Sequence, residues 1–157
     1  MYETANDMEE LLPHRKPFLF VDKILEASEE RITAEYVFSS DEFFFKGHFP
    51  GYPVVPGIIL IETMAQSGGA GLRKLGKIGN DALFFLASVD KVKFRRQVRP
   101  GDLVRSEIVN LKVSPKMIKQ AGRAFVNCEL AAEAEWLCLV DSGKVNAGAC
   151  RTPGAQI

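Results

Sequence analysis

The stretch GHFPGYPVVPGIILIETMAQ, residues 47–66, decides the fold of this chain. Glycine and proline take more than half of its first eleven positions, so the backbone there can continue neither a helix nor a sheet ladder and must form a shaped loop. An almost wholly apolar segment follows, and Pro56 stands at its start, where a missing N–H costs nothing. The pattern predicts a helix from Pro56 to Leu75. Its first half is apolar on nearly every side, which is typical of a helix buried all round.

Length and composition fit one domain. A chain of 157 residues with 46% hydrophobic content is long enough to bury roughly 70% of its unfolded surface. The acidic N-terminus lacks the features of a secretory signal, and no apolar run approaches the roughly 18 residues of a membrane span. We therefore expect a cytoplasmic protein with no membrane partner.

Cysteine and histidine usage argues against a metal site. The three cysteines lack CxxC or metal-type spacing, so neither a disulfide framework nor a zinc site is indicated. The chain has only two histidines, which excludes a multi-histidine site. His14 precedes a predicted strand, and a lone histidine there is more typical of a structural residue than of a ligand.

Period-two alternation of apolar and polar residues predicts strands on both sides of the helix. The predicted strands cover residues 18–25, 31–38, 82–94, 103–114, 117–127 and 130–140. Two strands, one buried helix and four more strands predict an α+β fold in which a six-stranded antiparallel sheet wraps around one long central helix. Because six strands cover only part of that helix, the open face implies a partner subunit.

Residues 1–140 are expected to form this single domain, with a short helix or lightly packed arm before Leu12. Residues 141–157 are small, polar and without periodicity, and we expect a disordered tail. Gly68, Gly69 and Gly71 lie in the second half of the helix, where they are expected to permit close approach of another backbone.

Two titratable residues, His48 and Glu62, interrupt the apolar surroundings of the loop and helix. Leaving a buried carboxylate uncompensated costs several kcal/mol against a typical stability of about 5–15 kcal/mol, so a decorative role for Glu62 is disfavoured. An apolar environment also favours the neutral, proton-donating form of a carboxyl group. The alternative is a Glu62 satisfied by Gln66 one turn on, or by a backbone N–H across a subunit boundary.

His48 is suited to act as a base because histidine titrates near neutral pH and the prolines around it hold its loop in one conformation. The loop leads into a helix N-terminus, where free N–H groups favour a developing oxyanion. Gly57 is the predicted donor of that N–H. A base, an acid and an oxyanion site fit proton abstraction next to a carbonyl with loss of a β-hydroxyl as water, in either direction.

Nucleophilic hydrolysis fits these residues less well. The loop contains no serine or cysteine, and Ser67 falls on a different face of the helix from Glu62. Phe43, Phe44 and Phe45 precede the loop and are interpreted as core or interface packing rather than as ligand contacts.

Acidic residues outnumber basic ones up to Glu62, and basic residues dominate from Thr63 to Arg123, although the net charge is zero. The densest basic part, KVKFRRQVR at residues 91–99, is either a docking surface for an acidic partner or the solvated face of a strand. Nucleic acid is disfavoured as that partner because no helix-turn-helix, zinc or aromatic-basic pattern accompanies the patch.

The sequence resembles the 3-hydroxyacyl-acyl-carrier-protein dehydratases of bacterial-type fatty acid synthesis, which have the hot-dog fold. The resemblance rests on LPHRKPFLFVDKILE, on GHFPGYPVVPGIILIETMAQ with its specific HFPGxPxxPGxxxxE pattern, on DKVKFRRQVRPGD and on AAEAEWLCL. Together these blocks cover most of residues 12–140.

The resemblance implies dehydration of 3-hydroxyacyl thioesters to trans-2-enoyl thioesters without a cofactor. It implies that His48 takes the α-proton, that Glu62 protonates or positions the leaving hydroxyl, and that the Gly57 N–H binds the thioester carbonyl. Glutamate at position 62 resembles the plain dehydratase rather than the relative that also isomerises the double bond. Phe49, Gln66 and Phe85 are predicted to bind substrate, Phe85 as an aromatic gate.

The partners implied are an acyl carrier protein that carries 3-hydroxyacyl chains and a second copy of the chain. Lys91, Lys93, Arg95 and Arg96 would dock the acidic carrier protein. The resemblance further implies that His48 and Glu62 of one site come from different subunits of a homodimer, with three such dimers often forming a hexamer. The acyl chain would occupy an apolar tunnel at the dimer seam.

Two other functions stay open. A thioesterase of the same fold would use Glu62 to activate water and would not need His48 in its proline-braced loop. A non-catalytic acyl-thioester sensor would need an output domain, for which the residues before Pro13 are too few.

Overall fold

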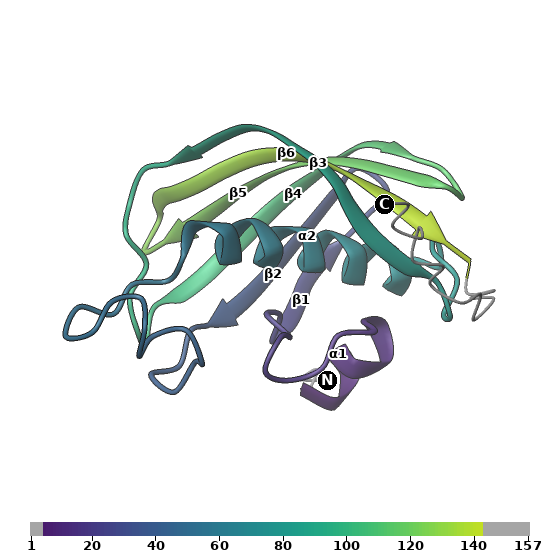
Figure 1. Ribbon diagram of the computed structural model, residues 1–157. Coiled ribbons are helices and arrows are strands. Elements are labelled where there is room, and N and C mark those ends of the chain that lie inside the picture. Colours follow the sequence, from purple (N-terminus) through teal and green to yellow (C-terminus); the bar gives the residue numbers. More distant parts are fainter. Residues whose placement is uncertain (1–4, 143–157) are drawn as a thin grey trace, which may run out of the picture.

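A single helix, α2, forms the axis of the computed structural model, which describes residues 5–142. The helix spans Gly57–Lys74, and a curved sheet wraps over it (Figure 1). Its side chains are buried on nearly all sides. This confirms the central helix predicted from the apolar segment after Pro56.

The sheet has six antiparallel strands in the order β1-β2-β4-β5-β6-β3. The strands are β1 Lys23–Ala27, β2 Arg31–Val37, β3 Leu83–Phe94, β4 Leu103–Val113, β5 Met117–Val126 and β6 Glu129–Asp141. The chain enters β3 from the end of α2, and β3 forms an outer edge beside β6. The predicted fold class and strand order along the chain are confirmed.

Local chemistry fixes both ends of α2. Pro56 is its N-cap, with a φ of −57°, and no side chain caps the first turn. At the other end Gly76 has a φ of +70°, its N–H donates to the Arg73 carbonyl at 2.9 Å, and the Lys77 N–H donates to the Leu72 carbonyl at 2.9 Å. This pair of bonds is a Schellman motif, for which glycine is the favoured residue.

The glycines of α2 admit side chains rather than another backbone, which corrects the prediction. A Cβ added to Gly68 would lie 2.3 Å from Gln120, one added to Gly69 would lie 2.5 Å from Phe84, and one added to Gly71 would lie 2.5 Å from Ile32. Side chains of β2, β3 and β5 therefore pack closely on the second half of the helix.

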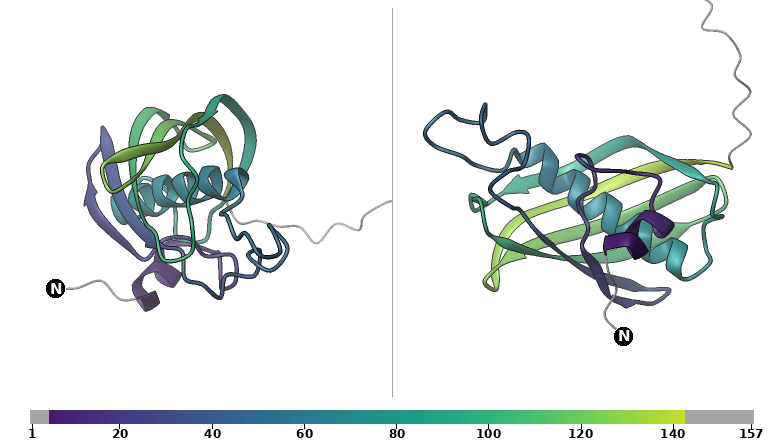
Figure 2. Two further views of the ribbon diagram at one scale, coloured as in Figure 1. Left: turned by 90° about the vertical axis from the view of Figure 1, so that its left-hand side faces the viewer. Right: turned by 90° about the horizontal axis from the view of Figure 1, so that it is seen from below.

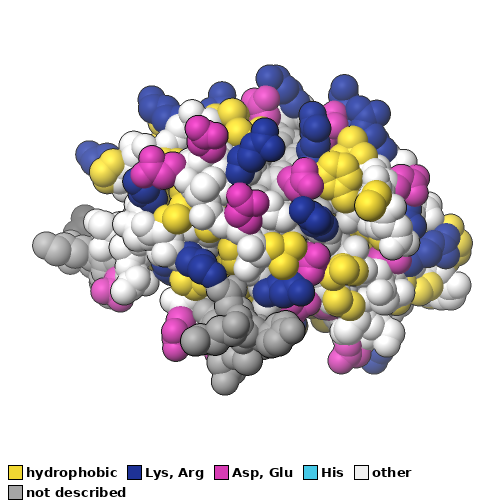
Figure 3. All heavy atoms as spheres, turned by 180° about the vertical axis from the view of Figure 1, so that it is seen from behind, with side chains coloured by type: hydrophobic (Ala, Val, Ile, Leu, Met, Phe, Trp, Pro, Cys, Tyr) yellow, Lys and Arg dark blue, Asp and Glu magenta, His cyan; other side chains and the backbone are white. Residues whose placement is uncertain are grey.

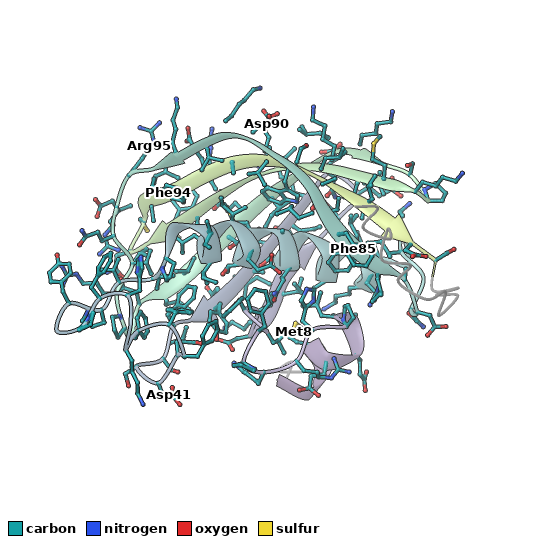
Figure 4. The ribbon with its side chains drawn as sticks, viewed as in Figure 1. Met8, Asp41, Phe85, Asp90, Phe94 and Arg95 are labelled. Carbon is teal, nitrogen blue, oxygen red and sulfur yellow. The ribbon has the colours of Figure 1, made fainter. Side chains whose placement is uncertain are left out.

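Two N-terminal predictions need correction. The predicted strand at residues 18–25 begins only at Lys23, because the Gln66 side chain takes the Phe20 N–H and the Phe18 carbonyl that a neighbouring strand would otherwise pair. The predicted arm is the helix α1, Ala5–Leu11, but it is not lightly packed. Met8 and Leu12 are at most 1% exposed, and α1 lies on the side of α2 away from the sheet (Figures 1 and 4).

Residues 143–157, most of the predicted tail, lie outside the described residues. No helix in residues 5–142 is long and apolar enough to cross a membrane.

Candidate active site

The loop before α2 holds His48 through contacts within its own few residues. The His48 N–H donates to the Phe44 carbonyl, and the His48 carbonyl accepts from the Val54 N–H, both at 2.9 Å. The ring atom Nδ1 lies 2.8 Å from the Val54 carbonyl oxygen, and the Phe49 ring stacks on the imidazole at 4.2 Å. Because a carbonyl oxygen can only accept, Nδ1 is the donor in this contact, which leaves Nε2 as the nitrogen that can carry the basic lone pair.

The first turn of α2 offers a free backbone donor. Gly57 is the first helical residue, and its N–H has no acceptor among residues 5–142. The Phe94 ring lies directly against Gly57, since an added Cβ would be 2.7 Å from Cζ of that ring. Figure 4 shows Phe94 on β3 beside the start of the helix, with Phe85 further back along the same strand. The predicted oxyanion donor is thus the backbone N–H of a residue without a side chain, next to the Phe94 ring.

Glu62 lies about 7.5 Å further along the helix axis than Gly57. Its side chain is 23% exposed in the single chain, and its Oε1 accepts a hydrogen bond of 2.9 Å from Gln66 Nε2. Gln66 is 1% exposed, and its amide also accepts from the Phe20 N–H at 2.8 Å and donates to the Phe18 carbonyl at 3.1 Å. The Gln66 contact that the sequence left open as an alternative therefore exists, and it holds one carboxylate oxygen in place.

The structure also places His14 beside Glu62, which sequence reasoning missed. His14 Nε2 lies 3.5 Å from Glu62 Oε1, and the imidazole packs against the Phe84 ring with centroids 5.8 Å apart. Burial lowers the pKa of His14, while the nearby Glu62 carboxylate acts in the opposite direction. No sequence pattern links positions 14 and 62, because the contact arises only when the N-terminal segment folds over α2.

His48 and Glu62 are not joined within the chain. Among residues 5–142, no hydrogen bond or ion pair links the two side chains: His48 contacts its own loop, and Glu62 contacts Gln66 and His14. The loop at residues 39–56 projects beyond the start of the helix (Figure 2). A hollow of about 520 Å³ lies over β2, β4, β5 and β6, and neither residue lines it.

Ser67 and Cys138, two potential nucleophiles near the helix, are both buried. Ser67 Oγ donates to the Thr63 carbonyl at 2.7 Å and is buried. Burial, with a smaller contribution from the Glu62 carboxylate, raises the pKa of Cys138 to about 12. No group of three or more His, Cys, Asp and Glu residues in the described part of the chain could hold a metal ion. Of the predicted phenylalanine cluster, Phe44 and Phe45 are buried, while Phe43 is exposed.

Three of the four predicted docking cations are engaged in ion pairs. Lys91 Nζ lies 2.8 Å from Glu135, Arg95 lies 3.2 Å from Glu133, and Arg96 lies 3.0 Å from Glu129 and 3.7 Å from Asp102. Lys93 has no ion-pair partner among residues 5–142. On the face seen from behind, cationic and anionic side chains are intermixed (Figure 3), and no large single-sign surface results.

A six-stranded antiparallel sheet wrapped around one long helix defines a hot-dog-fold protein, and comparison with known proteins gives the family. Residues 12–135 match the FabA-like domain family. The 3-hydroxyacyl-[acyl-carrier-protein] dehydratase FabZ of Desulforamulus reducens is 48% identical over 132 residues, covering 83% of this chain and 92% of the relative. The FabZ of Pelotomaculum thermopropionicum is 44% identical over 137 residues, covering 86% and 96%. The chain belongs to the family of FabZ-type 3-hydroxyacyl-[acyl-carrier-protein] dehydratases.

Solved structures agree on the fold. The dehydratase heterocomplex ApeI:P from Xenorhabdus doucetiae contains a chain that matches with a TM-score of 0.75 and 19% identity, covering 90% of this chain and 93% of that one. A hypothetical thioesterase with coenzyme A from Streptococcus pneumoniae matches with a TM-score of 0.57 and 8% identity, covering 76% and 84%. At such identities the likeness shows the fold alone.

Proposed function

We propose that this chain dehydrates 3-hydroxyacyl groups on acyl carrier protein to trans-2-enoyl groups in fatty acid biosynthesis. Family membership supports the reaction. The observation that carries the mechanism is the contact between His48 Nδ1 and the Val54 carbonyl oxygen at 2.8 Å, because it leaves Nε2 free to act as a base.

In the proposed reaction His48 Nε2 takes the proton from the α-carbon. Negative charge then develops on the thioester carbonyl oxygen, which the Gly57 N–H stabilises. Glu62, as a carboxylic acid, gives its proton to the β-hydroxyl, so the C–O bond breaks with release of water and the α,β double bond forms. The reverse sequence hydrates the double bond. General acid–base catalysis accelerates a reaction by about 10²–10⁴ per group, and one oxyanion donor accelerates it by about 10²–10³. Together these rate accelerations are adequate for this elimination.

Three aromatic or amide side chains are assigned to support this chemistry. The Phe49 ring stacks on the imidazole of His48 and is exposed. Gln66 donates a hydrogen bond to Glu62, and its amide is engaged by three groups of the chain. We therefore assign it an indirect role, in which it orients the carboxyl group that acts on the substrate. Phe85, 55% exposed on β3, is retained as a gate residue.

We further propose that the site is completed by a second copy of the chain. β3 is an edge strand of twelve residues that leaves Phe85, Leu86, Val92 and Phe94 between 37% and 55% exposed. Pairing of two such edges would bury this surface, continue the sheet across the dimer and bring His48 of one copy toward Glu62 of the other. Assembly of three dimers into a hexamer and a cytoplasmic location stay predictions from the sequence.

The first test follows the loss of enoyl absorbance when the purified protein meets a crotonyl thioester, beside His48→Ala and Glu62→Gln. We expect hydration by the wild type and a fall of at least about a hundredfold in each folded variant. Release of free thiol without hydration, retained in His48→Ala, would instead indicate a thioesterase. Binding of the thioester without either reaction would indicate a sensor.

Carrier-protein docking has its own test. We assign it to the cations Lys91, Lys93, Arg95 and Arg96, with Lys93 the one free of ion pairs within the described residues. Lys93→Glu is expected to raise the KM for a carrier-protein thioester several-fold and to leave the KM for a coenzyme A thioester unchanged. Lys112→Glu makes the same charge change on β4 and serves as the control. An equal effect of both variants would contradict the assignment.

A further inference from the structure

The carboxyl group of Glu62 is held on one side only. Gln66 Nε2 at 2.9 Å and His14 Nε2 at 3.5 Å both approach Oε1. No hydrogen bond or ion pair reaches Oε2 from residues 5–142. The Gln66 hydrogen bond therefore orients the carboxyl group, and the His14 nitrogen lies near the same oxygen.

Packing alone does not explain a histidine at position 14. Its Nδ1 is buried without a hydrogen-bond partner, which is unfavourable for stability. The ring packs against Phe84, a contact that a phenylalanine at position 14 would also make without an unpaired polar atom. What the imidazole adds is the nitrogen that faces Glu62.

We propose that His14 is a positioning residue for Glu62, whose Nε2–H joins the Gln66 amide in holding Oε1 so that Oε2 faces the substrate. This inference rests on the proposed role of Glu62 as the acid. The distance is 3.5 Å in the free chain, and catalytic contacts of this kind commonly tighten when substrate binds.

The charges around His14 suit a neutral donor. Its neighbours are Arg15 on its own segment and Glu62 and Arg73 on α2, and on β6 the Cys138 thiol lies near Glu62. Burial lowers the pKa of His14 most, Glu62 raises it, and the two arginines lower it. A lowered pKa favours the uncharged ring at neutral pH, and in the proposed arrangement its one proton is on Nε2. An imidazolium in its place would stabilise the ionised form of Glu62 and work against proton donation.

Two substitutions separate positioning from packing. His14→Phe keeps the ring and removes the donor, whereas His14→Gln places an amide nitrogen where Nε2 stood. We expect His14→Phe to lower kcat about 10- to 100-fold, the range known for groups that orient metal ligands, with KM little changed. His14→Gln should recover most of the wild-type kcat. If His14→Phe is as active as His14→Gln or more so, the positioning role is wrong and the histidine only packs.

A second measurement needs no folded His14 variant and no activity. The tautomer of the neutral His14 imidazole is measured by ¹⁵N NMR in the wild type. The inference requires the proton on Nε2, which lies 3.5 Å from Glu62 Oε1, with the partnerless Nδ1 unprotonated. A predominant Nδ1–H form would overturn the inference, because Nε2 would then have no proton to donate. Failure of the wild type to hydrate a crotonyl thioester would instead refute the proposed function, so the two failures are distinguishable.

Discussion

Mixing two inactive variants tests whether each active site is shared between copies of the chain. His48→Ala and Glu62→Gln are purified separately, combined, and allowed to exchange subunits. In a twofold dimer, random exchange makes about half of the molecules mixed dimers. Under the shared-site proposal, His48 and Glu62 of a site come from different copies, so each mixed dimer would have one site with both lesions and one site with neither.

About a quarter of the wild-type activity should therefore return. Since each variant alone is expected at or below about one hundredth of wild type, the gain is at least about 25-fold. The assay is hydration of a crotonyl thioester before and after exchange, with mixed dimers counted by native mass spectrometry.

In a matched control, His48→Ala is mixed with the double variant His48→Ala/Glu62→Gln in place of Glu62→Gln. This pair can form no intact site, so no activity should return. The shared-site proposal is refuted if mixed dimers form in the expected proportion and activity stays at the level of the separate variants. In that case both residues act within one chain, despite the absence of a contact between them in the described residues.

Three further outcomes follow from packing and burial. Gly69→Ala gains about 1 kcal/mol of helix propensity, but its Cβ would lie 2.5 Å from the Phe84 ring. Urea unfolding should therefore show a net loss of stability of about 1 kcal/mol, and a gain in stability would show that the ring moves freely. Gly76→Ala, at a φ of +70°, should cost about 1 kcal/mol through the strained left-handed conformation, and an unchanged Tm would contradict this. Burial raises the pKa of the Cys138 thiol to about 12, so this thiol should resist iodoacetamide at pH 8 in the folded protein, whereas exposed Cys128 should react. Peptide mapping measures the labelling of each cysteine, and equal labelling of the two would refute the burial argument.

The central helix and the hairpins could be predicted because their signals are local. The apolar run after Pro56 and the period-two pattern of the later strands each lie within one element. The turn at Asn127 and Cys128 closes with both residues at positive φ, as a type I′ hairpin turn requires. The residues before β1 could not be predicted in this way. Their backbone groups pair with Gln66, a side chain 46 residues away from Phe20, so an apolar segment with strand-like composition does not become a strand.

The residues of the candidate site likewise differ in whether local sequence could predict them. His48, Gly57 and Glu62 stand in one continuous stretch whose backbone chemistry can be read from the sequence. His14 could not be found, since its place beside Glu62 depends on how α1 and the following segment cross α2. The ion pairs of Lys91 and Arg95 were equally hidden, because Glu135 and Glu133 reach them only through the pairing of β3 with β6.

The two edges of the sheet differ in a way that affects handling of the protein. β1 is an edge of five residues, whereas β3 runs for twelve and is rich in exposed apolar side chains. A long apolar edge with unpaired N–H and C=O groups is a template for strand addition by any extended chain, and natural proteins normally cover such edges. An isolated copy of this chain is therefore an aggregation hazard, and a partner on β3 would protect the sheet as well as complete the site.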